Sequence, residues 1–349
     1  MRDASFSSQT LRRALGGGAN GLAHVPVATV TPMQQRFLGR TGLKVSRLGL
    51  GTLTWGRDTD EHEAREQLVA FSEAGGTLID TAAGYGDGAS EVLVGSLLGD
   101  VVPREEVVIA TKAGITRARG DRATDASRGY LITTLDASLK RLAVDHIDLW
   151  QVHTWVDDTP LEETLSALDY AVTSGRASYV GVSNYNGWQS AQAATWQTAV
   201  PGRARLASNQ VEYSLLNRSV ESEVIPAAEA LGIGVLPWSP LGRGVLTGKY
   251  RGGTPANSRA ASPHFANFVG PYLTERHGRI VEAVARAADG LGWSPLEVAL
   301  AWVRDRPGVT APIVGARTAA QLRGSLTVEE CELPSEIVQA LDDVSSDDT

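Results

Sequence analysis

The sequence predicts an α/β protein folded as a closed (β/α)8 TIM barrel, with an N-terminal β-hairpin capping the bottom. Eight short runs rich in Ile, Val and Leu alternate with amphipathic segments, which is typical of parallel strands joined by helical crossovers. Eight strands can close into a barrel, and the 349 residues exceed the roughly 250 that such a barrel needs. Polar residues follow the runs in phase, as they do where strands end at one mouth.

The predicted strands are short, and helical patterns lie between them. In Leu161–Ser174, for example, Leu165, Leu168 and Val172 recur at three- and four-residue steps and so share one helical face. We expect strands at Leu48–Gly51, Thr77–Asp80, Val107–Thr111, Ile147–His153, Ala177–Ser183, Leu206–Glu212, Gly234–Trp238 and Thr310–Val314. We expect helices at segments such as His62–Ala74, Leu131–Leu142, Leu161–Ser174 and Val220–Leu231.

A hairpin is predicted before the first strand, at Arg36–Val45 with its turn at Gly39–Gly42. It would cover the barrel bottom, which no βα loop reaches. The rival fold is an open doubly wound sheet, but Leu48–Gly56 lacks the G-x-G-x-x-G spacing that this fold favours. Two segments, Ile115–Ser127 and Gly242–Tyr272, exceed ordinary loop length and are expected over the active-site end.

Composition narrows the class of protein. The net charge is −8 without long single-sign blocks, which argues against nucleic acid or an anionic membrane as the main partner. No apolar run reaches the eighteen or so residues of a membrane span. The single cysteine, Cys331, rules out an internal disulfide and indicates a reducing, cytoplasmic location.

The first 32 residues differ from the rest. They contain Arg12-Arg13, a run of three glycines and then small residues up to Pro32. A twin-arginine export signal is one reading, but the following segment has no clean apolar core. We therefore expect residues 1–32 to form a disordered arm and residues 33–349 to form a single barrel domain.

Four polar residues at the ends of apolar runs suggest a proton-transfer site: Asp80, Tyr85, Lys112 and His153. A tyrosine donates a proton more readily if its pKa is lowered, and a nearby ammonium lowers it, so Lys112 is the candidate neighbour for Tyr85. Asp80 would keep Lys112 charged and oriented, and His153 could hydrogen-bond the oxygen that receives the proton. That oxygen would belong to a carbonyl that becomes an alcohol, so a hydride must come from elsewhere. No metal cage is evident, and a nicotinamide cofactor is the natural hydride donor. A Schiff base at Lys112 is the alternative chemistry.

Several motifs together resemble the aldo-keto reductase superfamily, in particular its bacterial, potassium-channel β-subunit-like branch. The resemblance covers about Met33 to Ser346, and the ordered set of motifs is far more specific than any one of them. The motifs are Gly76–Gly84 with Tyr85, Ala110–Gly114, Asp148–His153, Gly181–Asn184, Asn209–Arg218, Pro237–Lys249 and Pro312–Leu322.

The resemblance implies a catalytic tetrad of Asp80, Tyr85, Lys112 and His153, and an NADPH site along the barrel mouth. It implies that Ser183, Asn184 and Gln210 hold the nicotinamide carboxamide and that Trp238 stacks on the nicotinamide ring. Ser239, Leu241 and Arg243 match the pyrophosphate strap, and Lys249, Arg259, Arg317 and Gln321 match the region around the adenosine phosphate. The remaining implied cofactor positions are Gly51, Thr52, Asp80, Pro240, Gly315 and Ser325.

Two departures from the family pattern affect the site. Many relatives carry Glu-Asn in the last helix of the barrel to hold the adenine, where this chain has Gly324 and Ser325. Many also carry Trp directly after the Gly-Thr of the first strand. Here Leu53 follows Thr52 and Trp55 comes two residues later, so the wall of the substrate pocket should differ.

The expected function is NADPH-dependent reduction of an aldehyde or ketone to an alcohol, with a small carbonyl compound as the partner. A sugar-nucleotide ketoreductase of secondary metabolism is a narrower alternative. A channel-β-like regulatory subunit that binds the cofactor is another, although such proteins tend to have changed the His153 position. The substrate depends on the loops at Ile115–Ser127, Trp155–Asp158 and Gly242–Tyr272, and the sequence leaves the substrate and the oligomeric state open.

Overall fold

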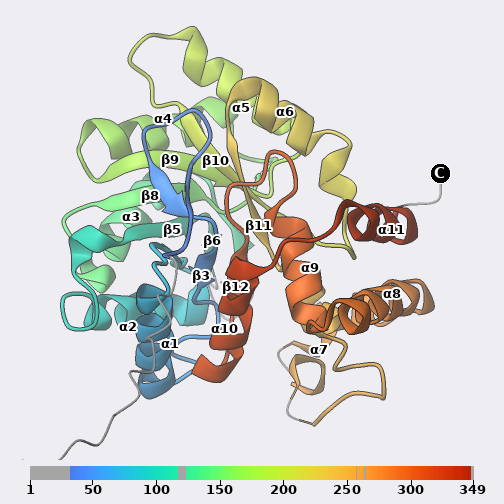
Figure 1. The fold of residues 1–349 in the computed structure, drawn as a ribbon. Coiled ribbons are helices and arrows are strands. Elements are labelled where there is room, and N and C mark those ends of the chain that lie inside the picture. Colours follow the sequence, from blue (N-terminus) through green and yellow to red (C-terminus); the bar gives the residue numbers. More distant parts are fainter. Residues whose placement is uncertain (1–31, 117–122, 257, 263–264, 347–349) are drawn as a thin grey trace, which may run out of the picture. The chain divides into compact units, whose positions relative to one another are not determined.

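Eight parallel strands close into a barrel in the computed structural model, which describes residues 32–116, 123–256, 258–262 and 265–346. The fold class predicted from the sequence is therefore confirmed (Figure 1). The barrel closes where β12 pairs with β3, through Ile313 opposite Gly49 and Gly315 opposite Gly51. Its strands are β3 (Gly49–Gly51), β4 (Leu78–Asp80), β5 (Val108–Ala113), β8 (Ile147–Val152), β9 (Ala177–Ser183), β10 (Leu206–Glu212), β11 (Gly234–Trp238) and β12 (Ile313–Gly315).

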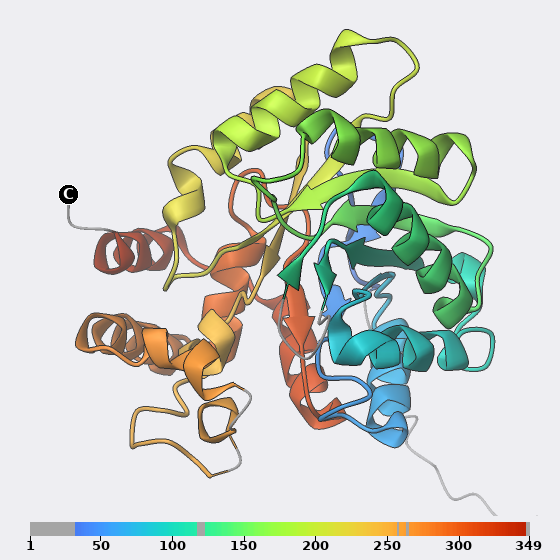
Figure 2. The ribbon, with the colours of Figure 1, turned by 180° about the vertical axis from the view of Figure 1, so that it is seen from behind.

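Helices cover the outside of the barrel, in the crossovers between successive strands (Figure 2). The last crossover holds two long helices, α8 and α9, and the final helix α11 packs beside α8. The helices are α1 (Glu61–Glu73), α2 (Ala89–Leu97), α3 (Arg128–Leu142), α4 (Leu161–Thr173), α5 (Gly187–Ala199), α6 (Val224–Leu231), α7 (Ala266–Val269), α8 (Glu275–Leu291), α9 (Pro295–Arg304), α10 (Ala319–Leu326) and α11 (Ser335–Ser345).

Local sequence explains several helix boundaries. Asn186 with Gln189, and Ser294 with Glu297, form reciprocal capping boxes that satisfy the first backbone N–H groups of α5 and α9. Gly292 ends α8 in the left-handed conformation, which costs glycine no steric clash. The longest described helix, α8, has 17 residues, and no described helix combines the length and apolar character of a membrane span.

The predicted hairpin is present. Strands β1 (Gln35–Phe37) and β2 (Lys44–Ser46) pair with Arg36 opposite Val45, and the hairpin lies across the near end of the barrel in Figure 1. Leu38, at the start of its turn, is fully buried among inward-facing residues of the strands, among them Leu78, Leu149 and Leu236. The hairpin therefore seals the bottom with an apolar side chain.

The eighth strand lies further along the chain than predicted. The sequence pattern favoured Thr310–Val314, whereas β12 is Ile313–Gly315. Val309 and Thr310 do contact β11, since Thr310 N–H donates to the carbonyl of Val235 at 2.8 Å. Pro312 has no N–H to donate, so the regular ladder begins only after it.

The two long segments are partly structured. The first contains β6 (Ile115–Thr116) and β7 (Ala123–Thr124), which pair as a short antiparallel ribbon. The second contains short 3₁₀ turns and α7. The predicted disordered arm, residues 1–32, lies outside the described residues apart from Pro32, so it and the domain boundary after it stay predictions.

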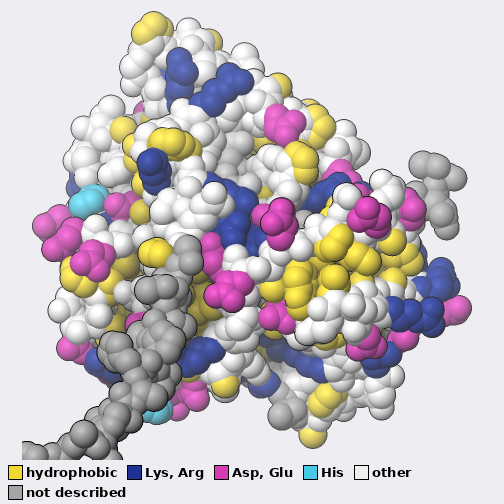
Figure 3. All heavy atoms as spheres, in the orientation of Figure 1, with side chains coloured by type: hydrophobic (Ala, Val, Ile, Leu, Met, Phe, Trp, Pro, Cys, Tyr) yellow, Lys and Arg dark blue, Asp and Glu magenta, His cyan; other side chains and the backbone are white. Residues whose placement is uncertain are grey.

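The hairpin face of the surface is mixed in character. Figure 3 shows hydrophobic side chains gathered over α8 and α11, with basic and acidic side chains interspersed elsewhere on this face. No charge of one sign dominates the part of the chain seen in this view.

We predict that Leu38→Ala will lower the free energy of unfolding by about 2–5 kcal/mol, since it leaves a cavity in the sealed bottom of the barrel. Phe37→Ala is the matched control, because the neighbouring Phe37 side chain is 56% exposed. It should cost less than about 1 kcal/mol. Urea unfolding of both variants checks this, and equal destabilisation would show that Leu38 does not act as a plug.

Candidate active site

One cavity of about 800 Å³ lies at the carboxyl ends of the barrel strands, on the side that Figure 2 faces. It is lined by almost every residue that the sequence predicted for the catalytic and cofactor sites; Lys112 and Thr52 are the exceptions. The predicted residues that line it are Gly51, Asp80, Tyr85, His153, Ser183, Asn184, Gln210, Trp238, Ser239, Pro240, Leu241, Arg243, Lys249, Arg259, Gly315, Arg317, Gln321 and Ser325.

Lys112 and Asp80 form a buried ion pair behind this cavity. Lys112 is 1% exposed and Asp80 is 2% exposed. The Lys112 Nζ donates to both carboxylate oxygens of Asp80, at 2.7 and 2.8 Å, and to the carbonyl of Thr81 at 2.8 Å. Burial alone would lower the pKa of Lys112, but the Asp80 carboxylate outweighs it and the pKa is raised. A charged ammonium that does not line the cavity is unsuited to Schiff-base formation.

Tyr85 lies between Lys112 and His153. The Lys112 Nζ is 5.2 Å from the centre of the Tyr85 ring, and the Tyr85 and His153 rings meet edge to face at 5.9 Å. The expected lowering of the Tyr85 pKa is wrong in its net direction. Burial raises the pKa of Tyr85 above its ordinary value of 10.0, and Lys112 only opposes that rise. The phenol is therefore a protonated donor at neutral pH, and Lys112 keeps its proton from being held still more tightly.

A tight turn places Tyr85 at the mouth. Tyr85 begins a 3₁₀ turn in which Gly86, Asp87 and Gly88 all have positive φ, at 56°, 53° and 95°. Such a conformation is strained for Asp87 and persists only where the surroundings enforce it. The first turn of α2, which follows directly, supplies that enforcement.

Two buried residues of α2, which the sequence analysis missed, attach this turn to three strands. Ser90 Oγ lies 2.8 Å from Thr52 Oγ1 and 3.0 Å from Thr81 Oγ1. Glu91 is fully buried; it accepts from Thr111 at 2.6 Å and from Arg141 at 2.7 Å. An acidic residue inside an apolar helical pattern was the available signal for Glu91.

Thr52 differs from its expected role in cofactor binding. Its hydroxyl is fully buried and donates to the carbonyl of Asp80 at 3.0 Å, besides its contact with Ser90. Thr52 therefore supports the end of β4 and not the cavity wall. Leu53 does line the cavity, whereas Trp55 is buried and donates to Gln67 at 3.2 Å, so Leu53 forms the wall there.

Amide and hydroxyl groups gather at the His153 end of the cavity. Gln210 Nε2 donates to Asp80 Oδ2 at 2.8 Å, and Ser183 Oγ donates to the carbonyl of Gln210 at 2.8 Å. Asn184 Nδ2 donates to the carbonyl of His153 at 2.9 Å, and Trp238 Nε1 donates to Asn184 Oδ1 at 3.0 Å. These groups could hold a planar carboxamide beside the tetrad.

A bulge in β10 turns Gln210 into the barrel. Leu206 pairs with Val180, but Asn209 pairs with Val182, so β10 carries one extra residue in this interval. Ala207 and Gln210 consequently both face inward, although regular alternation would place residues three apart on opposite faces. Gly181 makes room for the bulged Ser208, since a Cβ at Gly181 would lie 2.1 Å from Ser208 Oγ.

Cations gather at the other end of the cavity. Lys249, Arg259 and Arg317 line it together with Arg57, which the sequence analysis missed. Burial lowers the pKa of Lys249, and Arg259 and Arg317 lower it further. Burial and Arg317 likewise lower the pKa of Arg259. Among the described residues, neither Lys249 nor Arg259 forms an ion pair, so this end of the cavity suits a multiply charged anion.

Arg243, expected in a pyrophosphate strap, is already paired. Its guanidinium donates to both carboxylate oxygens of Glu212, at 2.8 and 2.6 Å, and lies 3.9 Å from the centre of the Phe268 ring. Phe268 stacks on Trp238 at 6.3 Å with 17° between the rings. The third nitrogen, Nη1, donates to the carbonyl of Phe268, so the Arg243 side chain supports the aromatic wall.

A nicotinamide dinucleotide fits this arrangement by the chemistry of its lining. The amide-rich end suits a carboxamide, Trp238 offers an aromatic face, and the cationic end suits phosphates. Phe265 closes the cationic end, with its ring centre 4.8 Å from the Arg57 guanidinium and 5.6 Å from that of Arg259. This contact joins loops about two hundred residues apart, so no sequence pattern indicated it.

Comparison with known proteins gives consistent matches. The model of the "Aldo/keto reductase family" matches residues 47–346. The chain is 39% identical to the "Uncharacterized oxidoreductase YrpG" of Bacillus subtilis (strain 168), over 89% of this chain and 96% of the relative. It is 36% identical to a "Probable voltage-gated potassium channel subunit beta" of Oryza sativa subsp. japonica, over 83% and 89% of the two chains. It is 34% identical to the "L-glyceraldehyde 3-phosphate reductase" of Escherichia coli (strain K12), over 83% and 86%.

We predict that Tyr85 loses its proton only above its ordinary pKa of 10.0. Below the pKa that Tyr85 has in the unfolded chain, the raised pKa contributes fully to the stability of the folded state. This contribution is lost as the pH rises through the pKa that Tyr85 has in the folded protein. The difference in tyrosinate absorbance between the parent and Tyr85→Phe reports this titration. Lys112→Met should move the midpoint higher, because it removes the charge that opposes burial. A midpoint at or below the ordinary value would contradict the assignment.

Proposed function

Because the chain belongs to the aldo/keto reductase family, we propose that it reduces an aldehyde or ketone to an alcohol, with NADPH as hydride donor and Tyr85 as proton donor. The observation that carries the proposal is the protonated Tyr85 phenol beside the buried Lys112–Asp80 pair and the His153 ring, at the wall of a cavity with a cationic far end. The match to the family model and the relative named as an oxidoreductase support the general reaction, which is carbonyl reduction.

The residues of the chain would divide the work as follows. The amide groups of Asn184 and Gln210 would hold the nicotinamide ring of the cofactor, which would supply a hydride to the carbonyl carbon. His153, at the edge of the Tyr85 ring, directs the carbonyl oxygen toward the phenol. Tyr85 transfers its proton to that oxygen as negative charge develops there, and Lys112 stabilises the phenolate that is left. Asp80 keeps Lys112 charged throughout.

The cationic end supports NADPH over NADH. The two cofactors differ by one 2′-phosphate, which is nearly dianionic at neutral pH. Besides burial, Arg259 and Arg317 lower the pKa of Lys249, and Arg317 lowers the pKa of Arg259, so an added dianion would relieve the repulsion among these cations. Arginine is well suited to this group, because its planar fork donates twice to a phosphate.

A second candidate is a regulatory subunit that binds the cofactor without sustained turnover. It is favoured by the relatives named as potassium channel β subunits, at 36% and 34% identity. The complete tetrad favours turnover instead. Consumption of NADPH with simple aldehydes distinguishes the two, since a purely regulatory subunit would show cofactor binding but no sustained oxidation.

We predict that Tyr85→Phe will lower the rate of carbonyl reduction by about 10²–10⁴-fold, because it removes the transferable proton and keeps the ring. Cofactor affinity should be almost unchanged. Steady-state reduction of an aromatic aldehyde, with a parallel cofactor titration, measures both quantities. If Tyr85→Phe reduces the aldehyde at the parent rate, Tyr85 is not the proton donor.

We predict that Arg317→Ala will weaken NADPH binding by roughly 10- to 150-fold and leave NADH nearly untouched, since a hydrogen bond to a charged group contributes about 1.5–3 kcal/mol. Arg323→Ala is the matched control, because Arg323 lies on α10 and is paired with Glu66 at 3.4 Å, away from the cavity lining. Quenching of tryptophan fluorescence measures both affinities. Equal NADPH and NADH affinities in the parent would refute the cofactor assignment.

A further inference from the structure

Three aromatic rings continue outward from the mouth of the cavity, and we call them the aromatic rim: Trp155, Tyr185 and Trp188. Trp155 comes two residues after His153, and Tyr185 directly follows Asn184; both His153 and Asn184 line the cavity. Trp188 lies in the first turn of α5. The rim residues do not line the cavity themselves, and two of them are joined to lining residues through the loops that follow β8 and β9.

The rings form a series of contacts from the interior to solvent. Trp155 meets Tyr185 edge to face at 5.2 Å and meets Trp188 edge to face at 5.3 Å. Tyr185 is 2% exposed, whereas Trp188 is 55% exposed. Large aromatic rings are normally mostly buried, so an exposed indole that packs on a second indole is suited to contact a ligand.

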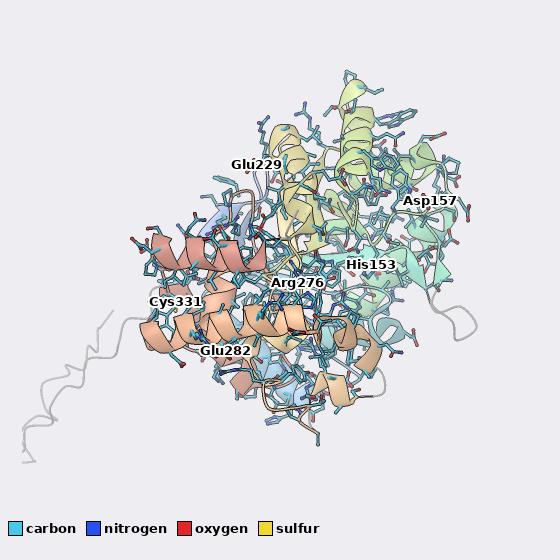
Figure 4. The ribbon with its side chains drawn as sticks, turned by 90° about the vertical axis from the view of Figure 1, so that its right-hand side faces the viewer. His153, Asp157, Glu229, Arg276, Glu282 and Cys331 are labelled. Carbon is cyan, nitrogen blue, oxygen red and sulfur yellow. The ribbon has the colours of Figure 1, made fainter. Side chains whose placement is uncertain are left out.

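A carboxylate accompanies the partly buried Trp155 and the exposed Trp188. Asp157 Oδ1 accepts a hydrogen bond from Trp155 Nε1 at 2.7 Å. Asp157 and the adjacent Asp158 are both exposed, so most of their acceptor positions face solvent. In Figure 4, Asp157 lies nearer the edge of the molecule than His153. The carboxylates repel anions and accept hydrogen bonds from hydroxyl groups.

An aromatic face beside a carboxylate is complementary to a neutral sugar ring. The C–H face of a pyranose packs on an indole, and its hydroxyl groups donate to carboxylate oxygens. An apolar ring would use only the indole, and a phosphorylated group would be repelled by Asp157 and Asp158. The observations therefore favour a hydroxylated, uncharged ring over either of these.

We propose that Trp155, Trp188 and Asp157 form a subsite that holds a neutral sugar ring carried by the carbonyl substrate, at a distance from the carbonyl that is reduced. The subsite rests on the proposed carbonyl reduction and names its substrate class. Trp188 and Trp155 contact the ring face, Asp157 accepts from its hydroxyl groups, and the reacting end enters the cavity toward Tyr85.

Three aldehydes with the same reacting group test the subsite. They are para-formylphenyl β-D-glucopyranoside, para-(cyclohexyloxy)benzaldehyde, which has an apolar ring of similar size, and para-methoxybenzaldehyde, which has no ring substituent. In the parent protein the glucoside should have a KM about 3- to 10-fold lower than the methoxy compound. Equal KM values for these two, or a cyclohexyl ether that binds as well as the glucoside, would overturn the proposal.

Variants assign the effect to the rim. Trp188→Ala should raise the KM of the glucoside about 3- to 10-fold with kcat unchanged, and should leave the methoxy compound unaffected. Trp196→Ala is the matched control, because Trp196 is a 43% exposed indole on the same helix, and it should change nothing. Asp157→Ala should raise the KM of the glucoside but not that of the cyclohexyl ether. A loss shared equally by all three aldehydes, or one reproduced by Trp196→Ala, would contradict the subsite.

Binding without turnover separates this proposal from the proposed function. If none of the aldehydes is reduced, the proposed function fails, but the binding of phenyl β-D-glucopyranoside can still be measured by isothermal titration calorimetry, which does not depend on the tryptophans that the variants remove. Saturable binding in the parent and in Trp196→Ala, lost in Trp188→Ala, would support the sugar subsite. Binding that is absent from the parent, or unaffected by Trp188→Ala, would refute it.

Discussion

The buried ion pair between Lys112 and Asp80 is the interaction on which the candidate site depends. Removing an ammonium and a carboxylate from water costs several kcal/mol per ion, which only good geometry and further hydrogen bonds offset. Here the Lys112 Nζ has three acceptors, and Asp80 accepts additionally from Gln210. Asp80 and Lys112 come from the neighbouring strands β4 and β5, and the closed barrel brings Gln210 of β10 across to the pair.

The surrounding structure is arranged to hold this pair and its neighbours in place. The bulge in β10 turns Gln210 toward Asp80, and Gly181 gives the bulged residue its space. On the other side, Ser90 and Glu91 fix the strained turn that carries Tyr85. Local irregularities of strand and turn thus occur where side chains must be aimed, and the regular part of the barrel supplies the frame.

Sequence patterns predicted the strands of the barrel well, but they predicted the wrong direction for the pKa of Tyr85. The bounds of β9, β10 and β11 agree with the predicted strands. The position of β12 was shifted, because the prediction began the strand at Thr310 although Pro312 within the run cannot donate to the ladder. The direction of the Tyr85 pKa was missed because burial depends on the packing of distant segments.

The other contacts that the sequence did not predict also depend on the packing of distant segments. Arg57 contacts the Phe265 ring from another loop, and Arg243 forms an ion pair with Glu212. No local sequence spacing indicates either contact. Motif resemblance placed Arg243 and Thr52 in cofactor roles, whereas their side chains are engaged within the protein. The cytoplasmic location inferred from Cys331 stays a prediction.

The uneven distribution of charge has a kinetic consequence. A chain of net charge −8 concentrates Arg57, Lys249, Arg259 and Arg317 at one end of a single cavity. Such a field attracts a polyanionic ligand over distances up to about the Debye length, roughly 8 Å at physiological ionic strength, and added salt shortens that reach. Ionic strength should therefore govern mainly how quickly such a ligand is captured. How long it stays depends on the short-range contacts inside the groove, which salt screens far less.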